Sequence, residues 1–97
     1  MIRDRKYLDS LRDQPCIITR LTPCDPAHIR WGLGGGMGLK PDDSRAVPLV
    51  HQLHQEQHQI GEVRFWLKQA NEHPEFLMES LIKAAELDYR RWLDDNQ

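Results

Sequence analysis

The chain has 97 residues, which is enough for one modest hydrophobic core and too few for two, so we expect a single domain over residues 1–97. Its formal net charge of −2 excludes a strongly basic protein that binds any polyanion, although residues 1–68 are mildly basic and residues 69–97 are acidic. No apolar stretch approaches the roughly 18 residues that a membrane helix needs, and no signal-peptide core follows the N-terminus. We therefore expect a cytoplasmic protein that does not contact a membrane.

The first third of the chain indicates one helix followed by short extended segments. Apolar residues at helical spacing among charged ones predict a helix over about residues 4–13. Short β-branched segments predict strands at residues 16–19 and 27–30. The chain has two cysteines, Cys16 and Cys24, and we interpret them as small buried thiols without metal partners, because a reducing compartment disfavours a disulfide.

Glycine dominates the middle of the chain. Residues 32–38 contain five of the six glycines, which predicts a flexible loop that lets the two halves of the chain meet. Direct phosphate binding by this loop is the alternative, although the Gly-Lys-Ser/Thr ending of a P-loop is missing. A turn is predicted at residues 41–44 and an extended segment at residues 46–50.

The second half indicates three helices. The first is predicted over about residues 51–59 and ends near Gly61, and the second carries an apolar stripe between residues 63 and 70. The last is predicted over about residues 74–94, with Pro74 in its first turn. Its apolar side chains favour core packing, and their heptad-like spacing also allows a homodimer seam; they are Met78, Ile82, Ala85, Tyr89 and Trp92.

Four of the five histidines form a pattern typical of a metal site. His51, His54 and His58 fall at i, i+3 and i+7, so on a helix they project from one face within about 60° of one another. His28 stands about two dozen residues earlier, on the other side of the glycine-rich loop. This pattern predicts that the helix face holds a divalent cation, whereas a lone histidine would indicate only an ordinary core or surface residue.

The combined motif resembles HNH-type nucleases of phage and prophage origin, and most of all the phage recombination-enhancement nucleases. It spans about residues 7–66 and consists of Asp25-Pro26-Ala27-His28-Ile29-Arg30, Gly35-Gly36-Met37-Gly38-Leu39-Lys40-Pro41-Asp42-Asp43, Val47-Pro48-Leu49 and His51-x-x-His54-x-x-x-His58-x-x-Gly61-Glu62-x-x-x-Trp66. The resemblance implies an α+β fold with a ββα-metal core, HNH-like and related to the treble clef, over about residues 16–66. Helices at the N- and C-terminus would flank this core.

The same resemblance implies an endonuclease that hydrolyses DNA phosphodiester bonds with one divalent metal ion. His28 would be the general base that takes a proton from the attacking water. His54 and His58 would hold the cation, whose charge stabilises the transition state. Asp43 is the candidate for the motif position that orients the base. The motif does not distinguish Zn²⁺, Mg²⁺, Mn²⁺ and Ni²⁺.

The resemblance also suggests partners. DNA is the expected substrate, and Arg30 and Lys40 are candidates for phosphate contacts. Recombination proteins are further candidate partners, because the most similar nucleases act in phage recombination.

Two departures from the nuclease pattern leave alternatives open. Many relatives hold a structural zinc between two Cys-x-x-Cys knuckles, whereas this chain has Thr19, Val50 and Leu53 at the matching positions, so a four-ligand zinc site is not expected. Some related nucleases have a further metal ligand directly before the base. This chain has Ala27 at that position.

The third metal ligand is therefore open, with Asp25 and His51 as candidates, and His51 also fits an exposed residue without a ligand role. These departures keep two other functions in view. One is a degenerate module that binds metal or DNA without cutting, and the other is an interaction protein that associates through its last helix.

Overall fold

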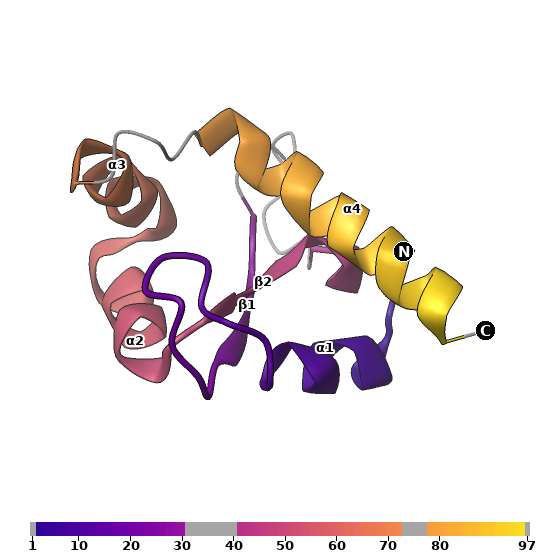
Figure 1. The fold of residues 1–97 in the computed structure, drawn as a ribbon. Coiled ribbons are helices and arrows are strands. Elements are labelled where there is room, and N and C mark those ends of the chain that lie inside the picture. The colour runs from indigo at the N-terminus through magenta and orange to yellow at the C-terminus, as the bar shows by residue number, and fades with distance from the viewer. Residues whose placement is uncertain (1, 31–40, 73–77, 97) are drawn as a thin grey trace.

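The computed structural model describes residues 2–30, 41–72 and 78–96 (Figure 1). Within them lie four α-helices, a two-stranded antiparallel sheet and one 3-10 turn. Their bounds in chain order are α1 (Arg5–Leu11), β1 (Asp25–His28), η1 (Asp43–Arg45), β2 (Ala46–Leu49), α2 (His51–Ile60), α3 (Glu62–Glu72) and α4 (Met78–Asp95). The α+β class expected from the sequence is thus confirmed.

The two strands form the centre of the fold and set the positions of the polar residues. Four residue pairs lie opposite one another: Asp25 with Leu49, Pro26 with Pro48, Ala27 with Val47, and His28 with Ala46. Asp25 therefore lies at the end of the strand pair where α2 begins, two residues after Leu49. His28 lies at the opposite end, where η1 leads into β2.

Apolar side chains pack on both faces of the strand pair, because successive residues of a strand point to opposite faces. The larger core joins this pair to α3 and the first half of α4, and its largest members are Ile29, Val47, Leu49, Phe65, Trp66 and Leu81. The smaller core joins it to α1 and the second half of α4, and contains Tyr7, Leu11, Ala46, Tyr89 and Trp92. In Figure 1, α2 and α3 lie on one side of the strands and α1 on the other, while α4 runs along both cores.

The prediction of a strand at residues 16–19 is wrong, since residues 17–19 form a turn. Backbone hydrogen bonds close this loop on itself: the Cys16 N–H donates to the Leu21 carbonyl at 2.9 Å, and the Arg20 N–H donates to the Cys16 carbonyl at 2.9 Å. Arg20 has φ of 66°, in the left-handed region that a strand does not use. The β-branched pair that suggested a strand, Ile17 and Ile18, instead packs against the larger core.

The other predicted elements occur near their expected positions. The strand predicted at residues 27–30 occurs two residues earlier, as β1. The extended segment at residues 46–50 and the helix at 51–59 are confirmed as β2 and α2. Gly61 ends α2 with φ of 94°, a conformation that favours glycine. The glycine-rich loop and the predicted start of the last helix at Pro74 lie outside the described residues.

Four of the five residues of the apolar stripe of α4 pack inside the chain, as predicted, and the side chain of the fifth, Met78, lies outside the described ones. Ala85 is buried in the larger core, where Ile82 also packs, and Tyr89 and Trp92 pack in the smaller one. None of the helices in the described part of the chain has the length and apolar character needed to cross a membrane.

Candidate active site

The helix face that the sequence predicted brings two imidazoles together. His54 and His58 lie one turn apart on α2, and their Nε2 atoms are 3.1 Å apart. Two nitrogens that bind one ion at about 2.0–2.1 Å lie about 3 Å apart when the angle at the ion is about 100°. The spacing of the two nitrogens therefore fits two ligands of a single transition-metal cation.

Asp25 holds the imidazoles from the strand side. Its Oδ2 accepts a hydrogen bond from Nδ1 of His54 at 3.0 Å and from Nδ1 of His51 at 2.7 Å. Burial opposes ionisation of this carboxyl, but the hydrogen bonds from His51 and His54 outweigh it and hold the pKa of Asp25 below its ordinary value. An ionised carboxylate only accepts, so each Nδ1 carries the proton. In the neutral imidazole of His54, Nε2 is then the acceptor; here it accepts a hydrogen bond from Nε2 of His58 at 3.1 Å, and a cation would take the place of that proton.

This geometry gives Asp25 a supporting position. Asp25 and His51 were the two candidates for the third ligand, and in the structure Oδ2 of Asp25 bonds to the Nδ1 atoms of His51 and His54. Within the described residues, no three His, Cys, Asp or Glu side chains are already arranged to hold a metal ion. His54 and His58 therefore fit a site with two histidine ligands. The described His, Cys, Asp and Glu side chains do not complete its coordination.

A second polar cluster surrounds His28. Its Nε2 is 2.9 Å from Oδ1 of Asp43, whose side chain is only 7% exposed. Oδ2 of Asp43 accepts a hydrogen bond from the backbone N–H of Asp4 at 2.6 Å, and Arg3 lies 3.5 Å from Oδ1. The structure therefore pairs the two residues that the sequence predicted as base and orienting carboxylate.

The carboxyl of Asp43 is ionised in this setting. Burial raises its pKa, but the hydrogen bonds from His28 and from the Asp4 amide, together with the charge of Arg3, outweigh that effect and leave the pKa below its ordinary value. The carboxylate accepts the proton on Nε2 of His28, so Nδ1 of that imidazole is left as the basic nitrogen.

The two clusters are separate in the structure. Asp25 and His28 are three positions apart on β1, a distance of about 10 Å along a strand, and an odd separation points them to opposite faces. In the part of the chain that the structure describes, no hydrogen bond joins His28 or Asp43 to His54 or His58. The site residues predicted from the sequence thus form two pairs near opposite ends of the strand pair.

Two arginines and one lysine are candidates for contacts with a phosphate. Arg30 is exposed at the end of the segment that follows β1, where its backbone N–H donates to Glu62 at 2.8 Å. Lys40 lies outside the described residues. Arg12, which the sequence did not single out, lies 3.9 Å from Oδ1 of Asp25 through its guanidinium. Its only signal in the sequence is a positive charge near the end of a predicted helix.

An apolar arrangement occupies the place of the zinc knuckles. Cys16 is fully buried, and its sulfur accepts the backbone N–H groups of Ile18 and Thr19 at 3.4 Å each. Val50 and Leu53 pack against the same core. Burial and the neighbouring Cys16 raise the pKa of Cys24 to about 11, so this thiol stays protonated at neutral pH. The prediction of small buried thiols is confirmed.

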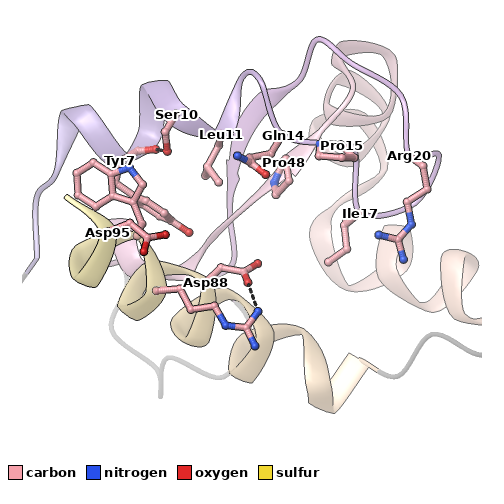
Figure 2. A pocket seen from close by; sticks show the side chains of 12 residues that line it. Tyr7, Ser10, Leu11, Gln14, Pro15, Ile17, Arg20, Pro48, Asp88 and Asp95 are labelled. Carbon is pink, nitrogen blue, oxygen red and sulfur yellow. Dashed lines mark hydrogen bonds and ion pairs between the residues drawn. The ribbon is translucent and has the colours of Figure 1, made fainter.

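A cavity of about 400 Å³ lies between α1, Pro48 and the second half of α4, and the residues that line it do not include the histidines of α2 (Figure 2). Charges of both signs line it, Arg20 and Arg91 against Asp88 and Asp95. This balance does not suit a phosphate backbone, which requires a surplus of positive charge. Tyr7 also lines the cavity, and its buried hydroxyl has no hydrogen-bond partner among the described residues.

Replacing Asp43 with asparagine should destabilise the protein by about 1–3 kcal/mol at pH 7, because an amide cannot match the bonds that the buried carboxylate accepts. The folded pKa of Asp43 is below the unfolded value, so its contribution is present above about pH 5 and is lost as the pH falls through the folded pKa. Urea unfolding at pH 7 and at about pH 3 should show a smaller acid loss in Asp43→Asn than in wild type.

The matched control for this substitution is Asp13→Asn, since Asp13 is exposed. It should leave stability within about 0.5 kcal/mol of wild type at both pH values. Equal acid sensitivity in wild type and Asp43→Asn would contradict the assigned role of the buried carboxylate.

A family model described as "Protein of unknown function (DUF968)" matches residues 1–87, which is most of the chain and includes every site residue discussed above. No curated protein matches the chain, and no solved structure matches it.

Proposed function

We propose that this chain, which belongs to the DUF968 family of unknown function, is a metal-dependent endonuclease that hydrolyses DNA on a ββα-metal core formed by β1, β2 and α2. The observation that carries the proposal is the pair of Nε2 atoms of His54 and His58, 3.1 Å apart on the helix that follows the strand pair. The resemblance of residues 7–66 to HNH-type nucleases of phage and prophage origin supports it.

The proposed chemistry assigns one task to each cluster. His54 and His58 hold a divalent cation, which when bound supplies positive charge beside the phosphate that is attacked. His28 takes a proton from the attacking water at Nδ1, because its Nε2 is bonded to Asp43. Asp43 keeps the imidazole in this tautomer and stabilises the imidazolium that forms.

We assign phosphate binding to two arginines in this proposal. Arg12 lies beside Asp25, on the metal side of the strand pair, and its side chain is 54% exposed. Arg30 is exposed two residues after His28, on the side of the base. A guanidinium carries five donors in a fixed fork, which suits a phosphate group better than a single ammonium does. The two residues would contact the DNA backbone on either side of the strand pair.

One observation favours a second candidate, a module that binds metal or DNA without cutting it. A base must come within reach of the water that it activates, whereas His28 and the histidines of α2 lie at opposite ends of the strand pair. Ala27, at the position directly before His28, is fully buried and adds no ligand. Association through α4 and partnership with recombination proteins stay predictions.

A plasmid assay separates the two candidates. Purified protein, freed of metal with chelator, is incubated with supercoiled plasmid and with Zn²⁺, Mn²⁺, Mg²⁺ or Ni²⁺ in turn, and nicked product is measured over time. The endonuclease proposal requires nicking by at least one metal, and EDTA should stop it. Metal binding seen by calorimetry without nicking under any of these conditions would favour the binding module.

A further inference from the structure

The carboxylate of Asp43 is hydrogen-bonded to the N-terminal segment of the chain as well as to His28. Its Oδ2 accepts the backbone N–H of Asp4 at 2.6 Å, and this bond joins residues 39 positions apart in the sequence. Because Oδ1 bonds to His28 and Oδ2 bonds to this amide, rotation of the carboxylate would break both bonds. The orientation of the His28 imidazole therefore depends on where the segment around Asp4 lies.

Asp4 is in turn fixed by two side-chain hydrogen bonds. Its Oδ1 accepts the backbone N–H of Tyr7 at 3.1 Å and so caps the first turn of α1. Its Oδ2 accepts the hydroxyl of Tyr89, from α4, at 3.0 Å. Tyr89 thus links α4 to the residue whose amide holds Asp43.

The aromatic ring of Tyr89 is itself well placed. It meets the ring of Tyr7 edge to face, with centroids 4.8 Å apart, and stacks near Trp92 with centroids 6.3 Å apart. Burial, the hydrogen bond to Asp4 and the nearby negative charges raise the pKa of Tyr89, so its hydroxyl keeps the proton that it donates. The ring positions the hydroxyl, and the hydroxyl fixes Asp4.

We propose that Tyr89 and Asp4 are positioning residues for the general base, which they hold through Asp43. The proposal rests on the proposed function, because it takes His28 as the base. It adds the N-terminal segment and the C-terminal helix to the catalytic apparatus, although neither belongs to the ββα-metal core. Loss of the Tyr89 hydroxyl removes one of the two side-chain hydrogen bonds of Asp4. The amide that holds Oδ2 of Asp43 is then held less firmly, and the imidazole of His28 samples other orientations more often.

The structure offers a closely matched pair of variants for the test. Tyr89→Phe removes the hydroxyl that bonds to Asp4, while Tyr7→Phe removes a hydroxyl of the same aromatic cluster that bonds to no residue in the described part of the chain. Both changes delete one oxygen and keep the ring. A general effect of altering this cluster would appear in both variants, whereas a positioning effect would appear only in Tyr89→Phe.

Four properties are measured on wild type and both variants: hydrogen exchange of the Asp4 amide, the tautomer of His28 by nitrogen NMR, the kcat and KM of DNA cleavage, and the Kd for metal. In Tyr89→Phe the Asp4 amide should exchange about tenfold faster, because its hydrogen bond opens more often. The Nε2–H tautomer of His28 should become less dominant. The kcat for cleavage should fall about three- to tenfold, as expected for the loss of one hydrogen bond, with KM for DNA and the Kd for metal unchanged. Tyr7→Phe should match wild type in all of these measurements.

A second variant covers the case in which Tyr89→Phe folds poorly. Asp4→Ser keeps an N-cap residue for α1 and the backbone amide, but it lacks the second carboxylate oxygen that accepts from Tyr89. In this variant the backbone amide of residue 4 should again exchange faster, and the Nε2–H tautomer of His28 should again become less dominant. Exchange and tautomer populations equal to those of wild type in either folded variant would overturn the proposal. Because both are measured without substrate, they decide it even if the wild-type protein cuts no DNA, a result that would reject the proposed function alone.

Discussion

Replacing His28 with alanine should lower the rate of DNA cleavage by about two to four orders of magnitude, the range that general-base catalysis usually contributes. The Kd for the metal should stay nearly constant, because His28 bonds to Asp43 and lies apart from the histidines of α2. Measuring single-turnover cleavage and calorimetric metal binding on the same preparation tests both halves of this expectation.

A second substitution guards against a loss of structure. His28→Gln keeps an N–H that can donate to the buried carboxylate of Asp43, but an amide has no basic nitrogen. It should therefore be about as inactive as His28→Ala while retaining more stability. Loss of metal affinity together with activity would instead place His28 in the coordination shell, at the position that Ala27 leaves open. Cleavage at the wild-type rate would reject the proposed mechanism.

Elements with a strong local signal were predictable from the sequence. The histidine helix could be placed to within a residue, because its polar face repeats at helical spacing and Gly61 supplies the positive φ that ends it. The segment at residues 16–19 could not, because two adjacent β-branched residues favour a strand, whereas here they pack against the core from a half-buried turn. Hydrogen bonds of Cys16 with Arg20 and Leu21 decide for the turn.

The candidate site divides in the same way. The approach of His54 and His58 follows from their i, i+4 spacing, so the sequence could predict it. The pairing of His28 with Asp43 followed only from the family resemblance. The bonds from Asp4 and Tyr89 join residues 39 and 85 positions apart, and no local pattern encodes such contacts. The separation of the two clusters also depends on strand register, which a sequence does not give for so short a pair.

Replacing both His54 and His58 with alanine should abolish the binding of divalent transition metals. The two Nε2 atoms are the close nitrogen pair on α2, and among the described residues no third His, Cys, Asp or Glu side chain is arranged with them to hold an ion. Calorimetry with Zn²⁺ and Ni²⁺ should therefore show no binding in the double variant, and nicking of plasmid should be lost with it.

The same helix provides the control for this double substitution. Gln55 and Gln59 are exposed, each one residue after a histidine, and have the same i, i+4 spacing. The Gln55→Ala/Gln59→Ala protein thus carries the same number of alanines on α2 without touching the imidazoles, and its Kd should lie within about twofold of wild type. Alanine favours helices, so neither double variant should unfold α2. If the histidine and glutamine variants bound metal equally well, the ion would have to sit elsewhere, and the assignment of His54 and His58 as its ligands would be wrong.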